Sequence, residues 1–317
     1  MNAMDTGAGT RGTAVRPGRT QETAKPRGVQ VLLTVLKYGI LTIGAISMIL
    51  PFVDMFLGAI KTPAEILARP PIWISRDPQW NVFIDITRIL PMGKLYLNSI
   101  IVSVSVTLLV LLTSGLSGFV LAKYQFRGRE LIFRLILSTM MFPVFVFLIP
   151  NYYILRHIPL AGGNDIMGWG GTGLMQNYLS LILPFSVSSF GIFMMRQFII
   201  GIPDELLDAA RIDGCSELRI FAQILMPQIK PVLATLAVFT FIGIWNEYLW
   251  TMTVTTSAPD MMTLPVGIRL LRDTLDPTRN TALMRAALAV GVLPVVALFL
   301  SLQRYYVRGI VLSGIKG

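Results

Sequence analysis

The chain has 317 residues, of which 54% are hydrophobic and only 14% are charged, and its formal net charge is +10. A soluble domain carries about 25% charged residues, so this composition argues against a soluble protein and for an integral membrane protein. The basic residues lie between long apolar runs, which favours the lipid bilayer over nucleic acid as their partner. A single cysteine, Cys215, and a single histidine, His157, provide neither a disulfide framework nor a Cys/His metal cluster, and we expect no cofactor.

The N-terminal residues 1–28 contain Gly, Thr, Arg and Pro but almost no large apolar side chains, so we expect a disordered basic tail. No short apolar segment with a small-residue cleavage site precedes the first long apolar run, and we expect that run to stay in the protein. Six apolar segments are long enough to cross a bilayer, which takes about 20 residues. They lie near residues 31–58, 97–122, 131–150, 177–195, 230–254 and 284–303.

The predicted fold class is therefore an all-α integral membrane protein, with a six-helix transmembrane domain over residues 29–303. Arg134 and Pro143 interrupt the third segment. In the second segment, Ser114 and Gly118 form a small-xxx-small pair, which lets two helices approach closely. We expect Asp54, near the outer end of the first span, to be solvated or paired.

The basic residues also predict an orientation. With a cytoplasmic N-terminus, sixteen Lys and Arg residues fall in inner segments and nine in outer segments. This bias predicts a multi-pass protein with both termini inside, including a cytoplasmic tail over residues 304–317. The outer loop 61–95, which contains Trp73 and Trp80, is expected to lie ordered on the outer face. The glycines of residues 151–176 favour a flexible excursion there.

Residues 196–229 lie between the fourth and fifth segments and are predicted to form a helix, a sharp turn and a second helix on the cytoplasmic face. Proline and two acidic residues at 203–205 suit a helix start. The small side chains of residues 209–210 leave room for another surface. Gly214 suits the left-handed residue after a helix end, and Ser216 can cap the second helix.

One run resembles a known motif. The run Pro203-Asp204-Glu205-Leu206-Leu207-Asp208-Ala209-Ala210-Arg211-Ile212-Asp213-Gly214 is similar to the EAA loop of ABC importer permeases, more narrowly those of the maltose-transporter type. The resemblance covers about residues 30–317 and includes the stretches 245–250 and 263–267. Asp208 stands where the motif has Glu, and Cys215 stands where it usually has Ala. Because Asp keeps the negative charge, we expect docking to survive the first change.

The resemblance implies that this loop docks into a groove on a separate ATPase subunit. The coupling residues it implies are Asp208, Ala209, Ala210, Asp213 and Gly214. It also implies a second permease subunit, two ATPase subunits and an extracytoplasmic sugar-binding protein, in the inner membrane of a bacterium. The cargo it implies is a carbohydrate, a di- or oligosaccharide above all, with sugar alcohols and glycerol phosphates left open.

The chain contains no G-x-x-x-x-G-K-[ST] phosphate loop, so we expect ATP hydrolysis to belong to another subunit and this chain not to be an enzyme. A candidate substrate pathway consists of Trp245, Asn246, Glu247 and Tyr248, since an ionisable group within a span is a functional candidate by default. Aromatic rings can stack on sugars while Asn and Glu supply hydrogen bonds. Alternatively, the same aromatic cluster marks the outer membrane boundary.

Two other functions remain as alternatives at this stage. An ion-coupled secondary transporter would need carboxylates in the core of the bundle, and only Asp54 and Glu247 qualify, both near span ends. A membrane-embedded enzyme would need catalytic groups, and the spans contain no paired acidic cluster.

Overall fold

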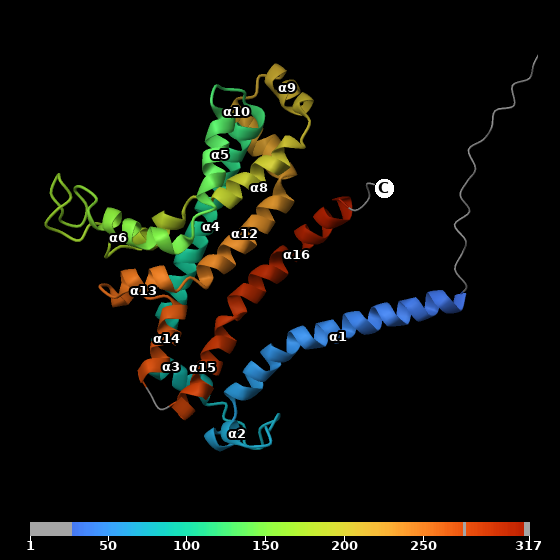
Figure 1. Ribbon diagram of the computed structural model, residues 1–317, viewed down its shortest axis with the longest axis vertical. Helices are drawn as coiled ribbons and strands as arrows, with labels where there is room; N and C mark the ends of the chain where they lie inside the picture. Colours follow the sequence, from blue (N-terminus) through green and yellow to red (C-terminus); the bar gives the residue numbers. More distant parts are fainter. Residues whose placement is uncertain (1–26, 275–276, 314–317) are drawn as a thin grey trace, which may run out of the picture. The chain divides into compact units, whose positions relative to one another are not determined.

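The computed structural model describes the backbone of residues 27–274 and 277–313 (Figure 1), and within these ranges every regular element is helical. The chain divides into two compact units, residues 1–51 and 52–317. The all-α fold class is thereby confirmed. In chain order the elements are α1 (Arg27–Ala59), α2 (Pro63–Leu67), α3 (Val82–Ile89), α4 (Met92–Lys123), α5 (Arg129–Thr139), η1 (Val144–Phe147), α6 (Leu148–Arg156), α7 (Tyr178–Ile182), η2 (Leu183–Phe185), α8 (Ser189–Ile200), α9 (Asp204–Ile212), α10 (Glu217–Arg219), η3 (Ile220–Leu225), α11 (Met226–Gln228), α12 (Lys230–Trp245), α13 (Leu249–Thr255), η4 (Pro259–Met261), α14 (Leu264–Thr274), α15 (Pro277–Gly291) and α16 (Leu293–Ser313).

Three stretches of helix in the described residues are long and apolar enough to cross a membrane by themselves. They are Val31–Ala59, Met92–Lys123 and Thr281–Gln303. Three further pairs of helices reach the same length and composition only when two bent pieces are counted as one span. Counted in this way, the described residues contain up to six spans by length and composition, which is the predicted number, although the fifth runs over Glu217–Trp245 instead of residues 230–254. The N-terminal tail lies almost wholly outside the described residues, whereas the helix of the last span continues through residues 304–313.

The third and fifth segments are not the continuous helices that hydropathy predicts. The third is α5 followed, after a break at Pro143, by η1 and α6, with a bend of 96°. Proline lacks an amide hydrogen and its ring collides with the preceding turn, so a helix ends before it. The fifth ends at Trp245, and a separate helix, α13, begins at Leu249. The fourth, formed by α7, η2 and α8, is also bent, by 45°.

The centre of unit 52–317 is α4, which packs against α8 and α12. Two glycines bring α4 and α8 together: a Cβ added at Gly118 of α4 would lie 2.5 Å from Cβ of Met195, and one added at Gly191 of α8 would lie 2.3 Å from Oγ of Ser114. Backbones this close leave no room for a larger side chain. The small-xxx-small prediction for Ser114 and Gly118 is therefore confirmed.

The long connection between α1 and α4 is ordered. Residues 61–95 form α2 and α3, and α3 packs against α15. Asp54 pairs with Arg285 of α15, with 3.7 Å between a guanidinium nitrogen and a carboxylate oxygen. Asp54 is thus paired, which was one of its two expected states.

The glycine-rich loop after α6 is built differently from the flexible excursion that the sequence predicts. The buried Asn164 side chain donates to the carbonyls of Arg156 and Ile158 at 2.8 and 3.0 Å. Its oxygen accepts from the amide of Gly171 at 2.8 Å. Gly173 adopts φ +58°, and a Cβ there would lie 2.2 Å from the Leu155 carbonyl. The glycines therefore permit a compact, internally hydrogen-bonded loop.

Candidate functional site

The predicted coupling helix is α9, and it lies on the surface with one apolar edge turned inward. Leu207 and Ala210 are buried in the main hydrophobic core, whereas Asp208, Ala209 and Asp213 are exposed. Ala210 therefore contributes to the packing of this chain, and the small exposed position on the helix is Ala209. The acidic first turn lies where the helix dipole stabilises negative charge.

The turn after α9 has the geometry that the sequence predicts. Gly214 adopts φ +80°, in the left-handed region that favours glycine. Its amide donates to the Arg211 carbonyl and the Cys215 amide donates to the Ala210 carbonyl, both at 3.0 Å. A Cβ at Gly214 would meet nothing within 4 Å, so the requirement for glycine comes from the backbone angle rather than from crowding. Cys215 is half-buried beside this turn.

The second helix begins after Ser216, as predicted, but the Ser216 side chain makes no capping hydrogen bond. It continues from α10 through a π-helical segment, η3, into α11, and meets α12 at a bend of 81°. Figure 1 shows α9 and α10 together, at the end of the bundle where α4 and α5 are joined.

The predicted coupling loop (residues 196–229) is attached to the C-terminal end of α4 at two points. We call the residues at these points the α4 clasp, which consists of Lys123, Tyr124, Asp204, Arg211 and Glu217. At the first point, Lys123 donates to the Asp204 carboxylate at 2.6 Å. At the second, the Tyr124 hydroxyl donates to Glu217. Arg211 donates to Glu217 at 2.9 Å and extends the clasp to Asp208 at 2.8 Å. The start of α9 and the start of α10 are thus both connected to one spanning helix.

The electrostatics of the clasp favour its charged state. The hydrogen bond from Arg211, and after it that from Tyr124, lowers the pKa of Glu217. The same Glu217 partner raises the pKa of Arg211. Burial, and after it the hydrogen bond to Glu217, raises the pKa of Tyr124, so its hydroxyl keeps its proton and remains a donor. At neutral pH the clasp is a charged network with a neutral phenol at one corner.

A second anchor at this end of the bundle was not predicted. Arg196 of α8 is buried, and it donates to the carbonyl of Leu121 at 3.0 Å and to the carboxylate of Glu130 at 2.6 Å. Its guanidinium lies 3.9 Å from the centre of the Phe133 ring. One side chain therefore ties α8 to both α4 and α5, beside the coupling loop.

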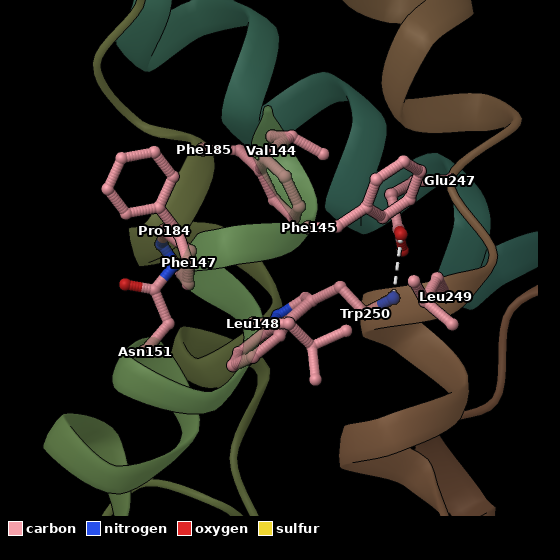
Figure 2. Close-up of a pocket in the computed structure, with 10 residues that line it drawn as sticks. All are labelled: Val144, Phe145, Phe147, Leu148, Asn151, Pro184, Phe185, Glu247, Leu249 and Trp250. Carbon is pink, nitrogen blue, oxygen red and sulfur yellow. Dashed lines mark hydrogen bonds between the residues drawn. The ribbon is translucent and has the colours of Figure 1, made fainter. Parts of the chain in front are cut away.

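The four candidate pathway residues do not gather around one cavity. Glu247 lines a cavity of about 310 Å³ with Trp250 and with Asn151 of α6 (Figure 2). Its carboxylate accepts from the amides of Trp250 and Thr251 at 2.7 and 2.8 Å, which starts α13. Figure 2 shows this side chain pointing at the first turn of α13.

Trp245, Asn246 and Tyr248 line a different cavity, of about 410 Å³, together with Arg269 of α14. Trp245 is buried, stacks on Phe241 with 5.6 Å between ring centres, and donates to the Gly291 carbonyl at 3.2 Å. Its ring is therefore occupied by packing inside the chain. In the described part of the chain, no three His, Cys, Asp or Glu side chains are grouped as metal ligands.

The chain is similar to known transport proteins over most of its length. A family model described as a binding-protein-dependent transport system inner membrane component matches residues 114–312. The arabinooligosaccharides transport system permease protein AraQ of Bacillus subtilis (strain 168) is 34% identical over 272 residues, covering 84% of this chain and 90% of that protein. The sn-glycerol-3-phosphate transport system permease protein UgpE of Yersinia pestis is 31% identical over 292 residues, covering 90% of this chain and 97% of that protein.

The fold also has a solved counterpart. A crystal structure of a bacterial ABC transporter involved in the import of the acidic polysaccharide alginate matches with a TM-score of 0.73. The match covers 89% of this chain and 98% of that one at 21% identity, which supports a common fold. The matched residues 114–312 include the predicted coupling loop at residues 196–229. The chain belongs to the family of binding-protein-dependent transport system inner membrane components.

Proposed function

We propose that this chain is a permease subunit of an ATP-driven importer, and that it moves a carbohydrate across the cytoplasmic membrane by alternating access. Its partners are a second permease subunit, two ATPase subunits and an extracytoplasmic binding protein. Both termini lie in the cytoplasm. The relatives named for arabinooligosaccharides and for sn-glycerol-3-phosphate support a di- or oligosaccharide as cargo, with a glycerol phosphate as the second candidate.

The observation that carries this proposal is the geometry of α9. Its exposed face presents Asp208, Ala209 and Asp213, and the α4 clasp connects the helix to a spanning helix. A short helix seated in a cleft of an ATPase subunit moves with that cleft, and the connected span moves with the helix. Asp208, Ala209, Asp213 and Gly214 form the docking surface and its turn, while Ala210 supports them from inside.

The ion-coupled alternative fits the structure less well. Both carboxylates that it would use already have partners, because Asp54 pairs with Arg285 and Glu247 accepts from three donors at the start of α13. A carboxylate that must bind and release an ion during each cycle needs a site that is open to that ion. We therefore assign Glu247 to holding α13 in place beside the pathway, with Asn151 facing the same cavity.

The test compares one bulky substitution on two exposed surfaces. Ala209→Trp places an indole on the docking face of α9, and Ala64→Trp places the same group on exposed α2 as the matched control. We expect both variants to enter the membrane at wild-type levels. Ala209→Trp should fail to co-purify with the ATPase subunit and should show no ATP-dependent uptake, whereas Ala64→Trp should retain both. Wild-type uptake by Ala209→Trp, or uptake by the permease subunits without any ATPase, would refute the proposal.

A further inference from the structure

We propose that the cavity at the start of α5 binds the phosphate headgroup of an anionic phospholipid. The cavity has a volume of about 510 Å³ and is lined by Gln125, Arg129, Glu130, Leu131 and Arg134, among others. It lies beside the α4 clasp, because Arg129 donates to the carbonyl of Tyr124 at 3.3 Å. Its placement in the inner leaflet rests on the proposed function, which puts the coupling loop in the cytoplasm.

The charges around this cavity do not balance. Two guanidinium groups, those of Arg129 and Arg196, pair with the single carboxylate of Glu130, and Arg134 adds a third positive charge beside them. Arg129 approaches this carboxylate at 3.1 Å and the buried Arg196 at 2.6 Å. Arg134 donates only to the Glu130 backbone carbonyl, at 3.3 Å, and it has no carboxylate partner among the residues that the structure describes. The group therefore carries a formal excess of two positive charges, which suits a phosphate.

The surroundings favour a lipid over a soluble phosphate. Next to the cavity, helix α5 carries three exposed apolar side chains, Leu131, Ile132 and Leu135, which are 55%, 45% and 58% exposed. Arg134 lies between them in sequence, one turn into a helix that counts toward a membrane span. An arginine in this position extends its charged end to the headgroup layer. A phospholipid would place its phosphate on the guanidinium groups and its acyl chains along the apolar side of α5.

Guanidinium groups match phosphate oxygens in charge and geometry, and they bind them through paired N–H donors. Basic residues at the cytoplasmic end of a spanning helix attract anionic headgroups in the same way. Each basic residue near an anionic membrane surface changes the affinity by roughly fivefold. Arg134 is the residue to test, because it is exposed and holds no other helix, whereas Arg129 and Arg196 also support the fold.

The experiment measures which lipids the assembled transporter retains. The complex with its partner subunits is exchanged into mixed micelles containing equal amounts of phosphatidylglycerol and phosphatidylcholine, and the bound lipids are counted by native mass spectrometry. We expect the wild type to retain phosphatidylglycerol preferentially, and Arg134→Gln to bind it about fivefold more weakly with phosphatidylcholine unchanged. Arg219→Gln is the control for lipid retention only, since Arg219 is an exposed cation outside the cavity that donates to Gln223. Its retention of both lipids should equal that of the wild type.

Several outcomes would overturn the inference. Equal retention of the two lipids by the wild type, or unchanged retention of phosphatidylglycerol by Arg134→Gln, would show that the cavity is not a site for an anionic lipid. An equal loss in Arg219→Gln indicates a general basic surface instead. Displacement of the lipid by millimolar inorganic phosphate indicates a site for soluble phosphate. Binding only to the permease pair, and not to the full complex, indicates that a protein subunit covers the cavity. ATP-dependent uptake is measured on the same samples, so that a failed lipid site is distinguished from a failed transporter assignment.

Discussion

Replacing Glu217 by Gln should loosen α9 from α4. The Glu217 carboxylate accepts from both Arg211 and Tyr124, and Gln keeps the shape but removes the charge. The side chains of Arg211 and Glu217 are 36% and 45% exposed, so solvent screening limits each contact to about 0.2–1 kcal/mol. For the two contacts together we expect a loss of about 1 kcal/mol in the free energy of opening the turn, which corresponds to roughly a fivefold change in the open population.

Hydrogen exchange measures this opening directly. The amides of Asp213, Gly214 and Cys215 donate to carbonyls of α9, so they exchange only when the turn opens. In Glu217→Gln they should exchange about fivefold faster, while in the control Arg219→Gln their rates should stay at the wild-type value. Exchange that changes by less than about twofold in Glu217→Gln would show that the clasp does not hold the coupling helix. Equal acceleration in both variants would lead to the same conclusion.

Three further predictions address the turn, the helix packing and the pH dependence. Gly214→Ala should lower the free energy of opening the turn by about 1–2 kcal/mol, and Gly214→Asn should lower it by less, because the left-handed backbone angle and not the available space limits this position. Hydrogen exchange of the Cys215 amide measures the two effects, and equal exchange rates in the two variants would contradict this order. Gly118→Ala should lower the thermal unfolding temperature in detergent, because its Cβ meets Met195, whereas Gly243→Ala, with nothing within 4 Å, should leave that temperature unchanged or raise it. The folded state lowers the pKa of Glu217, so the clasp stabilises the loop above the ordinary pKa of 4.5 and this contribution is lost as the pH falls through the folded value. Thermal unfolding of Glu217→Gln should lack this part of the acid destabilisation, and identical pH profiles for variant and wild type would contradict it.

The helix, turn and second helix of the proposed coupling loop could be predicted from sequence because their signals are local. A helix start at residues 203–205 and a glycine where the chain must turn lie within a dozen residues of each other. The partners of this loop could not be predicted. Lys123 is 81 positions away from Asp204, and Tyr124 is 93 positions away from Glu217. Nothing in either local sequence indicates which distant side chain will lie beside it.

Helix breaks were predicted poorly for a related reason. Pro51 lies inside the continuous helix α1, whereas Pro143 coincides with a bend of 96°. Hydropathy is similar around both residues, and the difference depends on what the neighbouring backbone can bond to. The break at residues 246–248 likewise separates Glu247 from Trp245, so neighbours in sequence line different cavities.

The three bent spans have a mechanical consequence. The central helix α4 is an uninterrupted rod of 32 residues, while the segments around it contain bends of 96°, 45° and 81° at short interruptions. A bend interrupts the regular ladder of main-chain hydrogen bonds in a helix, so we expect these points to be the least stiff of the bundle. During a transport cycle the strain should concentrate there. Pairs of spin labels bridging a bend should then report large distance changes, while pairs along α4 should keep a constant separation.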